Sequence, residues 1–156
     1  MSHYYLDSSA AVKLYVAETG AGWLHNLLLV EPPVAVLSSH LLRVELWSAF
    51  ARRRREGALS TADFEQTITW FTEHLHSLYR LVPVTESVLQ VACTLLETYP
   101  LRGIDALHLA TATILNQQLA AAELAPLIFL SADARLNQAA QAAGLMVSNP
   151  NQPHSS

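Results

Sequence analysis

Cysteine is almost absent from this chain, which has a single one, Cys93, among its 156 residues. One cysteine excludes an intrachain disulfide and a cysteine-rich zinc site. Charged residues are also scarce: they make up 14% of the chain, where soluble domains usually carry about a quarter. Because hydrophobic residues make up 51%, disorder and coiled-coil architectures are poor explanations, and one compact domain is expected.

Long apolar runs and an excess of basic residues are missing too. No uncharged apolar run reaches the roughly 18 residues that a membrane-spanning helix needs, and residues 1–7 lack the basic start of a signal peptide. We therefore expect a cytoplasmic protein with no membrane partner. Nine Lys and Arg against thirteen Asp and Glu give a formal charge of −4, so a nucleic-acid partner would need a local basic patch or bridging metal ions.

Short β-prone runs alternate with helical patterns along the chain. Strands are expected at about residues 4–6, 34–37, 78–84, 127–130 and 145–147. Helices are expected at about residues 10–16, 21–29, 40–55, 61–76, 86–99, 103–118 and 132–143. This alternation predicts an α/β fold with a parallel sheet of about five short strands flanked by helices.

The ends of several elements carry recognisable signals. Ser60 and Thr85 are expected to cap the helices that follow them, and Gly144 to end the last helix. Residues 148–156 are polar and rich in proline, so we expect a single domain over residues 1–147 followed by a flexible tail.

Four acidic residues occupy informative positions. Asp7 and Asp133 each follow an expected strand, where ligands usually bind in open α/β sheets. Glu45 has apolar helical neighbours at Leu41, Leu42 and Ala49, and Asp105 opens another apolar helix. Each has an ordinary alternative. Asp7 would be a helix cap, and Asp105 and Asp133 would be first-turn acids, Asp133 behind a Ser131 cap. Glu45 would lie at the surface edge, turned to solvent or paired with a nearby arginine.

The four acids together suggest more than each one alone. Intervals of 38, 60 and 28 residues separate them, so only tertiary folding could bring them to one end of the sheet. Clustered carboxylates repel one another, and a divalent ion that prefers oxygen ligands relieves the repulsion. We therefore expect Mg²⁺ or Mn²⁺ as the cofactor.

The sequence around these acids resembles a known family. Tyr5-Leu6-Asp7-Ser8-Ser9, the helical Glu45, residues 102–110 (RGIDALHLA) and residues 129–133 (FLSAD) resemble, in order and spacing, the four acidic motifs of PIN-domain nucleases. The best subgroup match is the VapC-type toxins of bacterial toxin–antitoxin pairs, over about residues 3–147.

The resemblance implies a specific activity and specific roles. It implies a metal-dependent endoribonuclease in which Asp7, Glu45, Asp105 and Asp133 bind the metal and Ser9 supplies a hydroxyl beside the first acid. Asp7 and Asp105 would hold the principal metal, Glu45 would orient a ligand or water, and Asp133 would support the outer shell. It also implies a small protein antitoxin as partner.

RNA binding by an acidic chain requires local cations. The candidates are Lys13, Arg43, Arg52, Arg53, Arg54, Arg55 and Arg102. Four consecutive arginines lie about 100° apart around a helix, so at most two can face one ligand, and a solvated helix end is the alternative for this run. We interpret His108 as a packed structural histidine rather than a general base. The three tryptophans favour core or interface positions, and one of their helices is a candidate homodimer contact.

Other functional classes fit the sequence less well. A phosphatase of the haloacid dehalogenase type needs a second acid where Ser9 stands. A receiver domain needs paired acids after the first strand and a lysine after a late one, where Ser131-Ala132 stands. The strongest alternative is a non-enzymatic protein-binding α/β module whose acids are helix caps.

Overall fold

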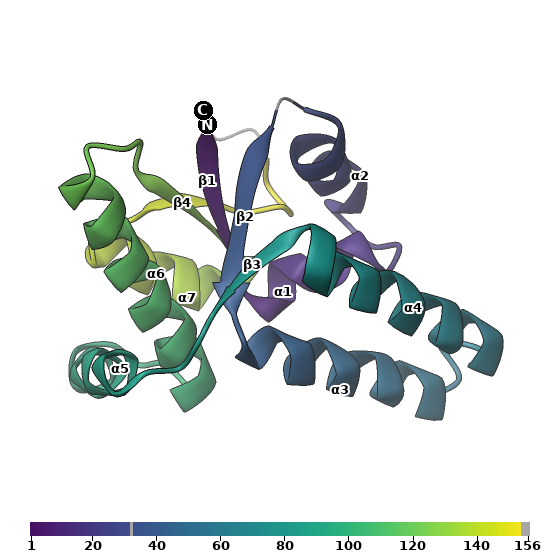
Figure 1. Ribbon diagram of the computed structural model, residues 1–156. Helices are drawn as coiled ribbons and strands as arrows, with labels where there is room; N and C mark the ends of the chain where they lie inside the picture. Colours follow the sequence, from purple (N-terminus) through teal and green to yellow (C-terminus); the bar gives the residue numbers. More distant parts are fainter. Residues whose placement is uncertain (32, 154–156) are drawn as a thin grey trace.

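The computed structural model describes residues 1–31 and 33–153 and contains a five-stranded sheet. This sheet lies between two groups of helices (Figure 1). The strands are β1 (Ser2–Leu6), β2 (Val34–Ser39), β3 (Tyr79–Val82), β4 (Leu127–Leu130) and β5 (Met146–Ser148). The longer helices are α3 (Leu41–Arg55), α4 (Thr61–Ser77), α5 (Glu86–Thr98), α6 (Gly103–Ala121) and α7 (Ala134–Ala142). The shorter ones are α1 (Ser8–Ala11), η1 (Val12–Leu14), α2 (Ala21–His25) and η2 (Asn26–Val30).

The sheet is parallel throughout, in the order β3-β2-β1-β4-β5. Successive side chains of a strand point to opposite faces, so Leu6 packs on one face with α1 to α4, while Tyr5 packs on the other with α6 and α7. Figure 1 shows these two groups of helices on either side of the sheet. The predicted α/β class and parallel sheet are confirmed.

Most predicted elements are present, and their caps form as expected. Ser60 and Thr85 accept hydrogen bonds from Asp63 N and Val88 N at the starts of α4 and α5. Gly144 follows α7 with a φ of +91°, the left-handed conformation that favours glycine.

The region before β2 is less regular than predicted. The first helix tightens into the 3₁₀ turn η1, and the second ends in the wider π-helical turn η2. In the first case the buried Lys13 bonds to Glu18 and to the Thr19 carbonyl, which holds the following segment back against the helix. No sequence pattern signals either change.

The C-terminal boundary differs from the predicted one. Strand β5 includes Ser148, and Pro150 is buried, so packed structure continues past residue 147. The Pro150 carbonyl lies so close to Gly20 that a Cβ added to Gly20 would overlap it. Of the predicted tail, residues 154–156 lie outside the described residues. Within the described ranges no helix is long and apolar enough to cross a membrane.

Candidate active site

The parallel topology brings the four acids toward one edge of the sheet. Asp7 directly follows β1, and Asp133 follows the neighbouring strand β4. Glu45 lies near the start of α3, which follows β2, and Asp105 lies in the first turn of α6, which leads back to β4. These four residues, the acid site below, therefore surround the carboxyl edge, where ligands bind in such sheets.

Asp7 is the most buried of the four. It is 3% exposed and caps α1 by accepting a hydrogen bond from Ala10 N at 3.0 Å. Ser131 Oγ donates to Oδ2 at 2.7 Å, and Ser9 Oγ lies 2.8 and 2.9 Å from the two carboxylate oxygens. Ser9 also accepts from Ala132 N at 2.9 Å. Asp7 thus caps α1 and also lies at the carboxyl edge of the sheet, so the two alternatives for this residue do not exclude each other.

Burial raises the pKa of Asp7, and the hydrogen bonds from Ser131, Ser9 and Ala10 only partly oppose it. Among the described residues, no lysine or arginine forms an ion pair with Asp7. A buried carboxylate without a cationic partner is costly, so this position favours an added cation.

Glu45 is held by a histidine rather than by an arginine. His108 Nε2 hydrogen-bonds to Glu45 Oε1, and His108 Nδ1 lies 2.8 Å from the Tyr5 hydroxyl. His108 is 1% exposed and Tyr5 is fully buried. The interpretation of His108 as a packed, hydrogen-bonded histidine is confirmed. The role of Tyr5 as its partner could not be predicted from the sequence, because 103 positions separate the two residues.

Asp105 pairs with the arginine three residues before it. Arg102 Nε lies 2.9 Å from Oδ2 and Nη2 lies 3.4 Å from Oδ1. The hydrogen bond and charge of Asp105 raise the pKa of Arg102, with smaller contributions from Asp133 and Glu45. One guanidinium therefore neutralises part of the charge of three site acids.

Asp133 is the N-cap of α7, which corrects the prediction of a first-turn acid behind a Ser131 cap. Its Oδ1 accepts from Arg135 N and Leu136 N at 2.9 and 3.2 Å, leaving Oδ2 for another partner. Ser131 instead donates to Asp7 and accepts from Asp133 N. It is a site residue that the sequence analysis treated only as a cap.

The donor set suits a hard divalent cation. All four acids supply carboxylate oxygens, the ligands that Mg²⁺ and Mn²⁺ prefer. Within residues 1–31 and 33–153, no three acidic, histidine or cysteine side chains are close enough to surround one ion as they stand. Mg²⁺ commonly uses one or two protein carboxylates and keeps several waters, so the separated acids still fit it.

The predicted RNA-binding cations have different environments. Lys13 is 4% exposed and pairs with Glu18 at 3.1 Å, so the prediction that it contacts RNA is wrong. Arg53 pairs with Glu18 at 3.3 Å, and the Arg54 guanidinium lies 4.1 Å from the Phe64 ring centre. The remaining candidates are exposed: Arg43, Arg52, Arg55 and Arg102.

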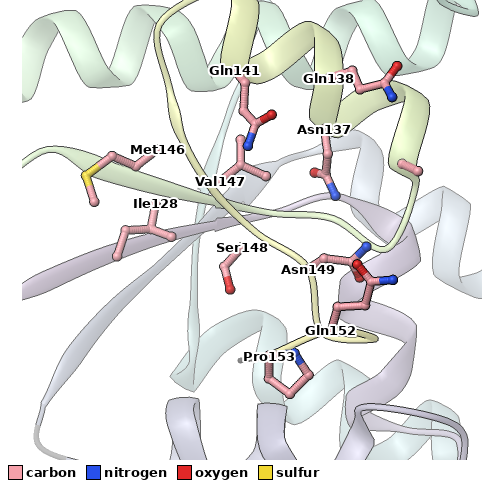
Figure 2. A pocket seen from close by; sticks show the side chains of 11 residues that line it. Ile128, Asn137, Gln138, Gln141, Met146, Val147, Ser148, Asn149, Gln152 and Pro153 are labelled. Carbon is pink, nitrogen blue, oxygen red and sulfur yellow. The ribbon is translucent and has the colours of Figure 1, made fainter. Parts of the chain in front are cut away.

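A pocket of about 430 Å³ lies between α7 and β5 (Figure 2). The side chains that line it are uncharged, and they include the amides of Asn137, Gln141, Asn149 and Gln152. Asn137 donates from Nδ2 to the Ser131 carbonyl at 2.8 Å, so one wall of the pocket supports the loop that holds Asp7. Because the pocket contains no acid, it is not the metal site.

Comparisons with known proteins identify the class to which this fold and acid site belong. The family model of the PIN domain matches residues 4–142, and the chain belongs to this family. Two relatives from Mycobacterium tuberculosis strains, Ribonuclease VapC45 and Ribonuclease VapC49, are each 34% identical over 144 residues, which cover 92% of this chain and 92% of each relative.

Solved structures share the fold at lower identity. VapC20 of Mycobacterium tuberculosis, described as a sarcin-ricin loop cleaving toxin, has a TM-score of 0.61 and 18% identity, and covers 92% of this chain and 96% of its own. VapBC2 of Rickettsia felis, bound to a promoter DNA fragment, has a TM-score of 0.62 and 12% identity, with coverage of 94% and 97%. A toxin–antitoxin complex from Klebsiella pneumoniae has a TM-score of 0.54 and 17% identity, with the same coverage.

Proposed function

We propose that this protein is a metal-dependent endoribonuclease, the toxin of a toxin–antitoxin pair. The observation that carries the proposal is the acid site. Its four carboxylates come from separate segments near one sheet edge, and the most buried of them, Asp7, forms no ion pair with a lysine or arginine among the described residues. PIN-family membership and two relatives named as ribonucleases support it.

Asp7 and Asp105 would hold the principal Mg²⁺ or Mn²⁺, with Glu45 and Asp133 supporting it. When bound, the metal supplies Lewis-acid stabilisation of the phosphate and lowers the pKa of water. Ser9 and Ser131 fix the orientation of the Asp7 carboxylate through their hydrogen bonds. Asp133 uses only Oδ1 for its helix cap, so Oδ2 remains available for another partner. No side-chain nucleophile is required.

The RNA backbone would be bound by exposed arginines near the acids. Arg52 lies seven residues after Glu45, almost two full helical turns along the same face, whereas Arg43, two residues before Glu45, lies about 160° away around the helix and is the weaker candidate. Arg102 lies beside Asp105. These residues supply the local positive charge that an acidic protein needs to bind a polyanion.

A protein antitoxin is the proposed partner, because two structural neighbours are toxin–antitoxin assemblies. A homodimer remains a prediction. Trp47 is 38% exposed on α3 and Trp70 is 51% exposed on α4, whereas Trp23 is partly buried. Helices α3 and α4 therefore offer apolar side chains for such a contact.

Cleavage of RNA by the purified protein tests this function. We expect Mg²⁺ or Mn²⁺ to support cleavage, EDTA to abolish it, and Asp7→Asn or Asp105→Asn to lower the rate at least about 100-fold, because each removes a metal-binding charge. Glu65→Gln on the exposed surface of α4 is the matched control. Metal-independent cleavage, or full activity in both site variants, would contradict the proposal. If the protein cleaves no RNA, and if variants of the acids still bind a protein partner, the results would favour the alternative of a non-enzymatic protein-binding module.

A further inference from the structure

Three buried or partly buried side chains form a hydrogen-bonded chain behind the acid site. The Tyr5 hydroxyl lies 2.8 Å from His108 Nδ1, and His108 Nε2 contacts Glu45 Oε1. Tyr5 lies two residues before Asp7, and His108 lies three residues after Asp105. These hydrogen bonds therefore connect β1, which precedes Asp7, with α6 and α3, which carry Asp105 and Glu45.

The chemistry of each partner restricts where the protons lie. An ionised carboxylate only accepts hydrogen bonds, so His108 Nε2 must carry the proton that it shares with Glu45. A neutral imidazole then has a lone pair on Nδ1 and requires a donor there. The Tyr5 hydroxyl lies 2.8 Å from Nδ1, within hydrogen-bond distance, and a phenol O–H can donate to that lone pair.

The surroundings hold both rings in place. The Tyr5 ring stacks on Phe129 with centres 5.6 Å apart and an angle of 8°, and it meets the His108 ring edge-on at 5.9 Å. The nearby hydroxyls of Ser38 and Thr111 donate to the carbonyls of Leu6 and Leu107. The packing therefore holds the Tyr5 ring with its hydroxyl beside His108 Nδ1, and the Ser38 and Thr111 hydroxyls are the other polar groups close to it.

We propose that Tyr5 locks His108 in the tautomer with its proton on Nε2, and that His108 thereby acts as a positioning residue for Glu45. The hydrogen bond holds Oε1 and leaves Oε2 available to a metal ion, and the Glu45 side chain is 19% exposed. Outer partners that orient a ligating carboxylate affect metal affinity or activity about 10- to 100-fold. This role rests on the proposed metal-dependent function.

The first test is ¹⁵N NMR of the full-length protein without metal. The His108 signals are assigned by their absence in His108→Leu, which keeps a similar volume. We expect an unprotonated Nδ1 and a protonated Nε2 in the wild type, and a loss of this pure tautomer in Tyr5→Phe. Protons on both ring nitrogens, or an identical tautomer in Tyr5→Phe, would overturn the proposal. This readout does not depend on RNA cleavage, so it stands even if the proposed function fails.

The second test measures Mn²⁺ affinity and RNA turnover in folded variants, checked by near-UV circular dichroism. Tyr5→Phe and His108→Leu should each weaken Mn²⁺ binding and lower kcat about 10-fold with little change in KM. His108→Gln, whose amide can still donate to Glu45, should recover most of both. Tyr4→Phe makes the same chemical change on the opposite face of β1, away from His108, and serves as the control. Equal Mn²⁺ affinity in Tyr5→Phe and Tyr4→Phe would overturn the proposal.

Discussion

Arg102 brings a permanent positive charge to a site built from acids. It pairs with Asp105 and also lies within the electrostatic influence of Glu45 and Asp133. Its side chain is 77% exposed, and exposed ion pairs contribute only about 0.2–1 kcal/mol to stability. Arg102 is therefore a weak counter-ion that a divalent metal can replace.

Arg102→Gln should distinguish the stabilisation that the guanidinium gives to the acid site from the stabilisation that a bound metal gives. Without metal, we expect a small loss of stability, about 0.2–1 kcal/mol, because the acids lose their counter-ion. The additional stabilisation by Mg²⁺ should exceed that of the wild type, because the metal no longer competes with the guanidinium. Thermal melts in EDTA and in Mg²⁺ measure both effects, with exposed Arg80→Gln as control. A smaller Mg²⁺ response in Arg102→Gln than in the wild type would contradict this view.

Individual residues also show where sequence reasoning was limited. The positions of Asp7 and Asp133 after strands were predictable, because the parallel-sheet rule places such residues at one edge. Their hydrogen-bond partners were not: Ser131 reaches Asp7 across 124 positions in the chain. Likewise, the burial of Lys13 depends on the turn through Glu18 and Thr19, which has no helical or strand periodicity.

At the scale of elements, α3 links the acid site to the arginine run. Its rise of about 1.5 Å per residue places Arg52 about 10 Å beyond Glu45, and 100° per residue leaves the two about 20° apart around the helix. Arg55 lies about 80° away from Glu45 around the same axis. Of the four consecutive arginines, only Arg52 therefore lies on the face of α3 that carries Glu45.

Arg52→Gln should weaken RNA binding more than Arg55→Gln does. If Arg52 contacts one phosphate, its loss should lower the slope of log K against log salt by about 0.7, the value for single strands. Arg55→Gln should leave the slope unchanged. Titrations of a short RNA at several salt concentrations, with inactive Asp7→Asn as the background, measure the difference. If both variants keep the salt dependence of the background protein, residues 52–55 form a solvated helix end and do not contact RNA.

Local signals predicted regular elements better than irregular ones. The caps at Ser60 and Thr85 and the terminator Gly144 act through neighbours within a few residues, so sequence alone is enough to recognise them. The π-helical turn η2 and the 3₁₀ turn η1 have no such signal, because tertiary context overrides local propensity there.

At the scale of the whole molecule, the segment after β5 returns to the start of the chain. Gly20, with a φ of +84°, lies against Pro150, whereas Gly57, with a φ of +78°, has no heavy atom within 4 Å of an added Cβ. The two glycines share a left-handed backbone and differ in their contacts. They form a matched pair for measuring how strongly the C-terminal segment is packed.

Gly20→Ala should therefore destabilise the protein more than Gly57→Ala. The left-handed conformation costs a non-glycine residue about 1–2 kcal/mol in both variants. The overlap with the Pro150 carbonyl should add about 1–3 kcal/mol in Gly20→Ala alone. Urea unfolding measures the difference, and equal losses in the two variants would show that residues 149–153 contribute little to the fold.

The convergence of the acids on one metal is the central claim, and Mn²⁺ binding tests it most directly. Titration of the RNA-free protein by electron paramagnetic resonance should show saturable binding that weakens in Asp7→Asn, Glu45→Gln, Asp105→Asn and Asp133→Asn, and most strongly in Asp7→Asn and Asp105→Asn. Glu65→Gln should bind as the wild type does. Unchanged Mn²⁺ affinity in all four site variants would show that these acids are helix caps and surface pairs, and would contradict a shared metal site.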